Sequence, residues 1–454
     1  MPEPVPLIVE LPADDDRAGQ MLALHEQFPE RYPVLLESTA VGLPLGRFSL
    51  LLASPGRCLR LERDGTLRGA GEGAGFCNRL DGWWLRERGA APPDPWPFAG
   101  GWFLFLGYEL AGEVEPSLRL PPSPTPLVAL AWRMQAALIL DHETGRCILI
   151  SEPAAAASLG SMQSDLEDAA GAASPAPVPL ATGLSEEEPG RYLRACRAAL
   201  AHIAAGDIYQ ANLARSWRAR AAGGASPGAI YRRLRSSNPG AFSGIAQLPG
   251  IAILSSSPER LVRVRGRHID TRPIAGTRPR LAVSDAPSIA ELTGSAKERA
   301  EHVMLIDLER NDLGRLCEPG TVRVEEFMAV ESYAHVHHIV SSVSGRLRAD
   351  VTPGNVIRAL FPGGTITGCP KVRCMQLIGD LEGAGRGAYT GAMGYLGRDG
   401  SLDLSILIRT MTIQGDEIEF RAGAGIVADS DPDRELEETR AKARGLLRAL
   451  GGAG

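Results

Sequence analysis

Residues 402–420 carry the clearest strand pattern in the chain. One predicted strand face carries Leu402, Leu404, Ile406 and Ile408, and the other carries Asp403, Ser405 and Arg409, which is the two-residue period of a strand with one buried face. A Gln-Gly-Asp turn at 414–416 joins this run to a second one, EIEF, so the stretch predicts a β-hairpin. Arg409 falls on the polar face of the first predicted strand. Its guanidinium can clamp a ligand carboxylate there or form a structural ion pair with Asp403.

Similar strand-like runs recur through the chain and outnumber its helical segments. They lie at 33–39, 47–54, 137–141, 207–220, 335–345 and in a second hairpin at 251–272 that turns near Gly266. Amphipathic helices are predicted at 190–206 and 295–312. Strands joined by tight turns pair antiparallel, and their apolar faces need a covering layer. We therefore expect an α+β fold of mostly antiparallel sheets with helices packed outside them.

One stretch of the chain differs in composition from the rest. Residues 153–189 are rich in Ala, Pro, Ser and Gly, which is typical of a connection between packed regions. We therefore predict an amino-terminal region at 1–172, a linker at 173–189 and a carboxyl-terminal region at 190–450. The first region contains no recognisable chemical motif, so we expect the chemistry in the last one.

The composition excludes several classes of protein. The 454 residues are 44% apolar and 22% charged and carry a net charge of −6, as in an ordinary globular protein. No run of Arg and Lys forms the basic stripe of a nucleic-acid-binding surface. No apolar run approaches the ~18 residues of a membrane helix, and the first residues lack the pattern of a signal peptide. Seven scattered cysteines without a CxxC pair indicate reduced thiols, so we expect a soluble cytoplasmic enzyme.

Two pairs of glutamates recur with the same spacing. Glu298 and Glu301 lie three residues apart on one predicted helix, so their carboxylates project side by side. Glu435 and Glu438 repeat this arrangement near the end of the chain. Adjacent carboxylates repel each other unless water solvates them or a cation bridges them, and an oxygen-only cage suits a hard dication such as Mg2+. A solvated helix surface is the commoner explanation of such pairs.

Two glycine-rich segments and two isolated residues could carry further chemistry. The loop FPGGTITGCPK at 361–371 and the segment GAGIV at 423–427 let backbone N–H groups approach an anion, although either could be an ordinary turn. Glu259 follows a proline where a strand is interrupted. A carboxyl in a partly apolar pocket can act as a general acid, whereas most such glutamates are simply exposed. His338 shares a strand face with two valines, which is more typical of a core histidine than of a catalyst.

Taken together, these stretches resemble the chorismate-utilising enzymes, the family of the anthranilate, aminodeoxychorismate, isochorismate and salicylate synthases. The resemblance runs from about 206 to 443 through GDIYQANLAR, SSSPERLVRV, TRPIAGTRPR, SAKERAEHVMLIDLERND, HHIVSSVSG, FPGGTITGCPKVR, GAYTGAMGY, LSILIRT and GAGIVADSDPDRELEETRAKA. The earlier half, with LLEST and GYE, resembles the amino-terminal region of the two aminating members. The resemblance implies two facing, mainly antiparallel sheets wrapped by helices, with the chorismate-binding catalytic region at 190–450.

The resemblance also implies roles for individual residues. It implies a Mg2+ ion, held by Glu298, Glu301, Glu435 and Glu438, that neutralises the ring carboxylate of chorismate. Glu259 corresponds to the proton donor for the departing C4 hydroxyl, and His338 to the histidine beside that hydroxyl. The implied substrate contacts are Thr277, Gly364, Thr365, Tyr389, Arg409, Gly423, Gly425 and Lys442.

Two further catalytic positions distinguish the members of this family. Gln210 stands where the water-adding members carry a lysine that activates water. A neutral amide cannot be that base, so ammonia is the implied nucleophile. Asn212 and the PGGTITG loop resemble the aminodeoxychorismate synthase branch, component I, whereas Ala275 is the anthranilate-type residue. Well-studied aminodeoxychorismate synthases carry a nucleophilic lysine at that position.

Several dispersed similarities outweigh this single alanine. We therefore expect 4-amino-4-deoxychorismate, a precursor for 4-aminobenzoate and folate synthesis, with anthranilate plus pyruvate as the alternative. No glutaminase signature is present in the sequence. The resemblance therefore implies a separate glutamine amidotransferase subunit that supplies ammonia, either an aminodeoxychorismate synthase component II or one shared with anthranilate synthase. No nucleic-acid or membrane partner is expected.

Overall fold

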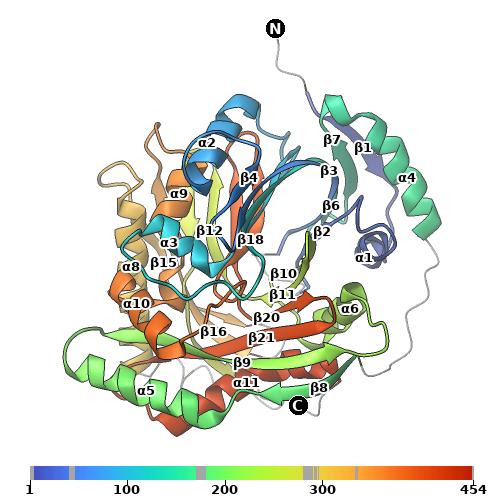
Figure 1. Cartoon of the computed structure of the whole chain (residues 1–454). Helices are drawn as coiled ribbons and strands as arrows, with labels where there is room; N and C mark the ends of the chain where they lie inside the picture. Colours follow the sequence, from blue (N-terminus) through green and yellow to red (C-terminus); the bar gives the residue numbers. More distant parts are fainter. Residues whose placement is uncertain are drawn as a thin grey trace.

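The strands of the protein form one continuous network of antiparallel pairs (Figure 1). The computed structural model describes residues 5–39, 46–169, 180–279, 290, 294, 296–332 and 336–451, with backbone alone at 275–279, 296–298, 332 and 336. Every pairing between described strands is antiparallel. The network divides into two sheets, called the first and the second sheet below.

The first sheet runs down Figure 1, from β1 at the upper right to β8 at the bottom. Its strands, in spatial order, are β1 (Leu7–Leu11), β7 (Cys147–Ser151), β6 (Leu127–Asp141), β3 (Phe48–Glu62), β2 (Val34–Glu37), β10 (Phe242–Leu248), β11 (Ile251–Ser257), β20 (Thr410–Gln414), β21 (Glu417–Ile426), β9 (Gln210–Ala221) and β8 (Ala181–Glu186). The two-residue strand β17 (Gly368–Cys369) pairs with the start of β9.

The second sheet shares the long strands β3 and β6 with the first. Its order is β4 (Leu67–Gly69), β3, β6, β5 (Gly101–Leu106), β18 (Ala392–Gly397), β19 (Leu402–Ile406), β12 (Arg260–Arg265), β13 (His268–Thr271), β16 (Val336–Arg346) and β15 (Arg323–Ser332), with β14 (Ile274–Pro279) also beside β16. β6 pairs with β5 through its first half and with β7 through its second half. Each shared strand therefore bends from one sheet into the other.

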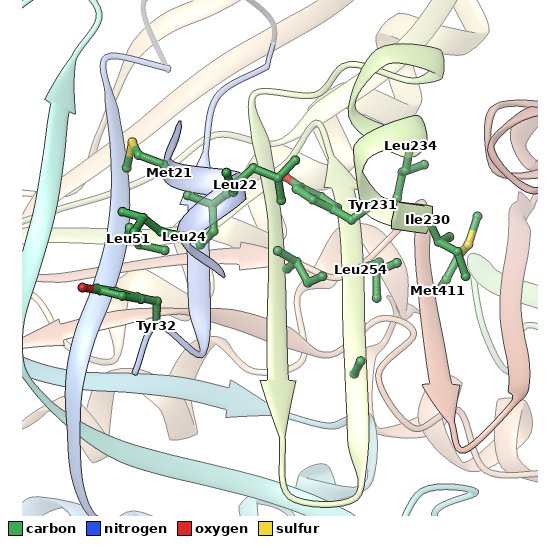
Figure 2. Packing of buried hydrophobic residues seen from close by; sticks show 14 of the residues in the cluster. Met21, Leu22, Leu24, Tyr32, Leu51, Ile230, Tyr231, Leu234, Leu254 and Met411 are labelled. Carbon is green, nitrogen blue, oxygen red and sulfur yellow. The ribbon is translucent and has the colours of Figure 1, made fainter. Parts of the chain in front are cut away.

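The buried side chains form three main clusters because the strands alternate between two apolar faces. In β5, Phe103 and Phe105 enter the cluster between the sheets, while Trp102 and Leu104 enter the cluster under the outer helices. The third cluster lies on the outer face of the first sheet, where Tyr231 of α6 packs near strand residues such as Leu254 (Figure 2). Each fully buried side chain of this size contributes about 1.5–3 kcal/mol to stability.

Helices cover the outer faces of both sheets. Those over the first sheet are α1 (Arg17–Gln27), α4 (Ala157–Ala169), α6 (Pro227–Ser237) and α11 (Pro432–Leu450). Those over the second sheet are α2 (Phe76–Glu87), α8 (Ala296–Gly314) and α9 (Pro353–Leu360). Helices α5 (Pro189–Ala204) and α10 (Lys371–Glu382) pack beside β9, and the short α3 (Ala111–Val114), η1 (Tyr108–Leu110), η2 (Pro153–Ala155) and η3 (Gly364–Ile366) complete the list of described helices. None of them has the length and apolar character needed to cross a membrane.

The predicted fold class is confirmed: the protein is α+β, with two facing, mainly antiparallel sheets and outer helices. The helix predicted at 190–206 is α5, and the strand predicted at 335–345 is β16. Of the predicted linker 173–189, residues 173–179 lie outside the described part of the chain, while 181–186 form β8 and pair with β9. Strands from the two predicted regions share both sheets, since β2 pairs with β10 and β5 pairs with β18.

Candidate active site

Two neighbouring stretches of the chain each continue from a strand of one sheet into a strand of the other sheet. Both are interrupted where they pass between the sheets, and the two interruptions lie side by side. β11 ends at Ser257 and β12 begins at Arg260, because Pro258 between them has no N–H to continue the ladder. On the partner side β19 ends at Ile406 and β20 begins at Thr410. β11 pairs with β20 in the first sheet, and β12 pairs with β19 in the second. The site is built around these two interruptions.

Glu259 and Arg409 occupy the two interruptions. The N–H of Ile406 donates to the carbonyl oxygen of Glu259 (3.0 Å), and the N–H of Ser256 donates to the carbonyl oxygen of Arg409 (3.2 Å). These bonds cross from one interruption to the other and fix their spacing. Arg409 has a φ of 51°, a left-handed conformation that a non-glycine residue rarely adopts. Such strain persists where the surrounding structure imposes it, which is typical of functional sites.

The prediction that Arg409 lies within a continuous strand is therefore wrong. Residues 407–409 form the bend between β19 and β20, because the two halves of the predicted strand belong to different sheets. Asp403, the ion-pair partner considered for Arg409, binds Arg260 with two hydrogen bonds of 2.9 and 3.1 Å. The turn predicted at 414–416 is correct and joins β20 to β21.

Glu259 is a buried carboxyl whose pKa suits proton donation. Burial raises its pKa to about 7, while the neighbouring Thr365 hydroxyl, the backbone of Ile274 and the charges of Arg409 and Lys442 act in the opposite direction. The site thus gathers Glu259 with three residues predicted as substrate contacts. A carboxyl with this pKa is about half protonated at neutral pH and can act as a general acid.

His338 lies on β16 of the second sheet, and β13 separates this strand from β12, which begins directly after Glu259. It is buried in β16 and stands opposite Thr277 of β14, while Ala275 stands opposite Ile339. A bulge separates the two β14 positions. Their side chains lie outside the described part of the structure, so the roles assigned to Ala275 and Thr277 stay predictions.

Gly423 and Gly425 of β21 have no side chains, and polar side chains from other strands and turns occupy the space beside them. A Cβ on Gly423 would lie 2.7 Å from the Tyr389 hydroxyl and 2.9 Å from Oδ1 of Asn212. A Cβ on Gly425 would lie 2.4 Å from Nε2 of Gln210. Any larger residue would therefore displace these polar groups. Burial raises the pKa of Tyr389 to about 12, so its hydroxyl keeps the proton and can donate it in a hydrogen bond.

Side chains from α8 and α11 reach the same strands. Nε2 of Gln210 donates to Oε1 of Glu301 on α8 (3.2 Å), which ties the helix to the start of β9. Gln210 is buried, and its Oε1 has no hydrogen-bond partner among the described residues. On α11, Nζ of Lys442 donates to the carbonyl oxygen of Gly423 (3.0 Å) and forms an ion pair with Glu438 (2.8 Å). The two acidic helices therefore flank β9 and β21.

The acidic pairs offer the donor chemistry that a dication requires. Glu301, Glu435 and Glu438 present carboxylate oxygens only, which suits Mg2+. The side chain of Glu298 lies beyond the described atoms. Among the side chains that the structure does describe, no three His, Cys, Asp or Glu residues lie close enough to hold an ion. The magnesium prediction therefore stays a prediction.

A second buried carboxyl lies behind the glycine-rich loop. η3 begins at Gly364, and a Cβ there would lie 3.6 Å from Oε1 of Glu309 on α8. Burial and the neighbouring Asp312 raise the pKa of Glu309 to about 7. Asp312 in turn forms an ion pair of 2.5 Å with Lys371, the first residue of α10. These contacts connect the loop to two helices and fix its position.

Arg386 is a residue that the sequence analysis missed. It is buried and forms an ion pair with Glu382 (2.5 Å). It also donates to the carbonyl oxygens of Asn212 (2.6 Å) and Ile366 (3.3 Å) and to the hydroxyl of Thr390 (3.2 Å). One guanidinium thus holds β9, the glycine-rich loop and the Tyr389 turn together. The four-residue spacing of Glu382 and Arg386 was the available signal.

Comparisons with known proteins agree with this arrangement. A family model for chorismate binding enzymes matches residues 78–448. The chain is 39% identical to anthranilate synthase component 1 of Thermus thermophilus over 444 residues, which cover 94% of each protein. It is 38% identical to aminodeoxychorismate synthase of Streptomyces griseus over 445 residues, which cover 92% of this chain and 61% of that protein.

The fold also matches a solved structure. The crystal structure of anthranilate synthase component I from Streptococcus pneumoniae TIGR4 superposes with a TM-score of 0.79 at 30% identity, covering 90% of this chain and 93% of that one. Two relatives with different names are thus about equally similar to this chain, so the names do not distinguish the product. The family model nevertheless spans most of the sequence and includes both interruptions. The chain therefore belongs to the family of chorismate-binding enzymes.

Proposed function

We propose that the chain aminates chorismate with ammonia and forms 4-amino-4-deoxychorismate. The observation that carries this proposal is Gln210, a buried amide that contacts Glu301 and lies against Gly425. A family member that adds water needs a base at this position, and an amide cannot accept a proton at neutral pH. The amide oxygen can instead accept a hydrogen bond from ammonia.

Glu259 would supply the proton for the departing hydroxyl of chorismate. Hydroxide is a poor leaving group, so transfer of a proton to the oxygen as the carbon–oxygen bond breaks lowers the barrier. The pKa of about 7 allows Glu259 to hold this proton at neutral pH. His338, buried on β16, would lie beside the same hydroxyl.

The charges of the site complement a substrate with two carboxylates. Arg409 and Lys442 provide positive charge next to Glu259, and Tyr389 provides a protonated hydroxyl. The segments that carry Gly364 and Gly423 bring backbone close to the same space. Cations and N–H donors in a buried site bind carboxylates strongly because water no longer screens their charges.

A Mg2+ ion would be held by Glu298, Glu301, Glu435 and Glu438 and would supply positive charge against the ring carboxylate. Glu301 is already oriented by Gln210, whereas Glu438 is paired with Lys442. Binding of a dication would therefore require Glu438 to exchange one cationic partner for another.

Ala275 favours a second candidate product. An alanine methyl group cannot form an adduct with the substrate ring, so the 4-amino product requires ammonia to act without a covalent enzyme intermediate. If ammonia itself adds at C2, the pathway leads to anthranilate and pyruvate instead. Asn212, which is half-buried and lies against Gly423, supports the first candidate because it resembles the residue of the aminodeoxychorismate synthases.

Product analysis separates the two candidates. Purified protein is incubated with chorismate, Mg2+ and 15N-ammonium without glutamine, and the products are separated by chromatography. A non-fluorescent 15N-labelled product that an added lyase converts to 4-aminobenzoate supports the proposal. Fluorescent anthranilate with equimolar pyruvate supports the second candidate. An unlabelled hydroxylated product would refute amination and with it the role of Gln210.

The ammonia source is the remaining part of the proposal. We propose a glutamine amidotransferase subunit as the partner. Glutamine alone should give no product with the isolated chain, and glutamine plus such a subunit should replace the ammonium salt. Equal turnover of glutamine by the isolated chain would contradict this part alone.

A further inference from the structure

One buried side chain holds the acidic part of α8 to the second sheet. Among residues 299–304, whose side chains the structure describes, His302 alone is buried, and it has no exposed surface. The apolar side chains that anchor the rest of the helix, such as Leu305 and Ile306, follow it in the sequence. The position of this part of the helix therefore depends on the contact that His302 makes.

That contact is a hydrogen-bonded bridge through a serine. Nε2 of His302 lies 2.6 Å from the hydroxyl oxygen of Ser341 on β16, and the N–H of Met328 on β15 donates to the same oxygen (2.9 Å). The Ser341 hydroxyl accepts the hydrogen bond from Met328 and forms a second one with His302, so it joins α8 to both β15 and β16. The side chains of His302 and Ser341 are buried beneath the helix, and Met328 is half-buried.

The third member of the bridge is held in a strained conformation. Met328 has a φ of 54°, and the register of β15 against β16 shifts between Glu326 and Ala329. A bulge aims the Met328 N–H at Ser341, where a regular strand would direct it along the ladder. Strain of this kind points to a functional constraint on the segment that carries it.

A neighbouring side of α8 faces the start of β9 in the candidate active site. Glu301, next to His302 in sequence, contacts Gln210 of β9, and Glu298 lies one helical turn earlier. Helix α8 therefore connects the second sheet, through His302, with the first sheet, through Glu301. A shift of His302 would move both carboxylates relative to β9.

We propose that His302 is a positioning residue for the acidic turn of α8. Through Ser341 and Met328 it fixes the backbone that carries Glu298 and Glu301, and it thereby tightens the binding of a divalent cation by these carboxylates. This inference rests on the metal role in the proposed function. A merely structural histidine would affect the stability of the fold and leave the affinity for the cation unchanged.

Calorimetric titration of the metal-free protein with Mn2+ tests this inference without any turnover. S341A removes the bridge with the loss of a single oxygen atom, and H302L removes the ring nitrogen. Both should weaken Mn2+ binding about 10- to 100-fold, as loss of a contact that orients a metal ligand usually does. H302Q places an amide oxygen near the position of Nε2 and should restore affinity to within about threefold of wild type.

I306V is the matched control, because it removes one methylene group from the same helix without touching the bridge. It should lower the melting temperature and leave the Mn2+ dissociation constant unchanged.

If S341A and H302L fold and bind Mn2+ as tightly as wild type, the inference is overturned. If the wild-type protein itself binds no divalent cation, the proposed metal role fails first and this inference fails with it. If I306V weakens Mn2+ binding as much as S341A does, the effect is one of general stability and the inference is again wrong.

Discussion

Replacement of Glu259 by glutamine should abolish amination and at the same time stabilise the protein at alkaline pH. Burial raises the pKa of Glu259 to about 7, whereas the ordinary value for a glutamate is 4.5. Between these two values the folded protein holds a proton that the unfolded chain has released. The free energy of unfolding therefore decreases as the pH rises through this window.

The magnitude follows from the distance between the two pKa values. Relative to a side chain that never ionises, the raised pKa of Glu259 lowers the free energy of unfolding of the wild-type protein by about 3 kcal/mol at pH 8 and by about 1 kcal/mol at pH 5, since each pKa unit corresponds to about 1.4 kcal/mol. Glutamine keeps the shape of the side chain and never ionises. The E259Q variant should therefore exceed wild type in stability by about 3 kcal/mol at pH 8 and by about 1 kcal/mol at pH 5.

Urea denaturation at pH 5, 6.5 and 8 measures this difference, and the ammonia-dependent assay measures the loss of activity. E309Q is the matched control, because Glu309 is buried with a pKa of about 7 but is not a predicted substrate contact. It should gain stability with the same trend in pH and keep its amination activity. A stability difference between E259Q and wild type that does not grow from pH 5 to pH 8 would refute the reasoning. Wild-type turnover by E259Q would refute the role as general acid.

Three further outcomes follow from the site. At a fixed concentration of free ammonia, kcat/KM should fall about tenfold per pH unit above pH 7 as Glu259 loses its proton, and a flat profile up to pH 9 would contradict this. The variant R409M should raise the KM for chorismate about 100-fold without changing the circular dichroism, because a charge-assisted contact to a carboxylate is lost; an unchanged KM would place Arg409 outside the substrate site. The variant E382A should lose about 3–5 kcal/mol of stability in thermal denaturation, since it leaves the buried Arg386 without its carboxylate; a loss below 1 kcal/mol would show that the ion pair is dispensable.

The sequence predicted the fold class because the evidence for it is local. Alternation within strands and tight turns between them indicate antiparallel pairing without any knowledge of distant partners. The division of strands between the two sheets is not local. Strands β3 and β6 belong to both sheets, and only their pairing partners decide where each one bends.

The same contrast explains which site residues could be placed. Pro258 marks the interruption before Glu259 in the sequence itself. The stretch 402–413, however, contains no proline or glycine to mark a break, and Arg409 bends there because its flanking strands pair with partners in different sheets. Contacts between residues far apart in the sequence could not be predicted from it either. Gln210 and Glu301 lie 91 residues apart, and Arg386 donates to the carbonyl oxygen of Asn212, 174 residues away.

The paired interruptions also constrain how this chain can change in length. Side chains alternate along a strand, so one inserted residue between β11 and β12 would turn every following side chain of β12 to the other face. The hydrogen bonds between Ile406 and Glu259 and between Ser256 and Arg409 tie that interruption to the one between β19 and β20. An insertion or deletion in one interruption would move the Glu259 carboxyl away from the Arg409 guanidinium unless the other interruption changed in length as well. Among the described residues, the turn at 142–146 between β6 and β7 has no such link to the site, so length variation should be found there and should be absent at 258–259 and 407–409.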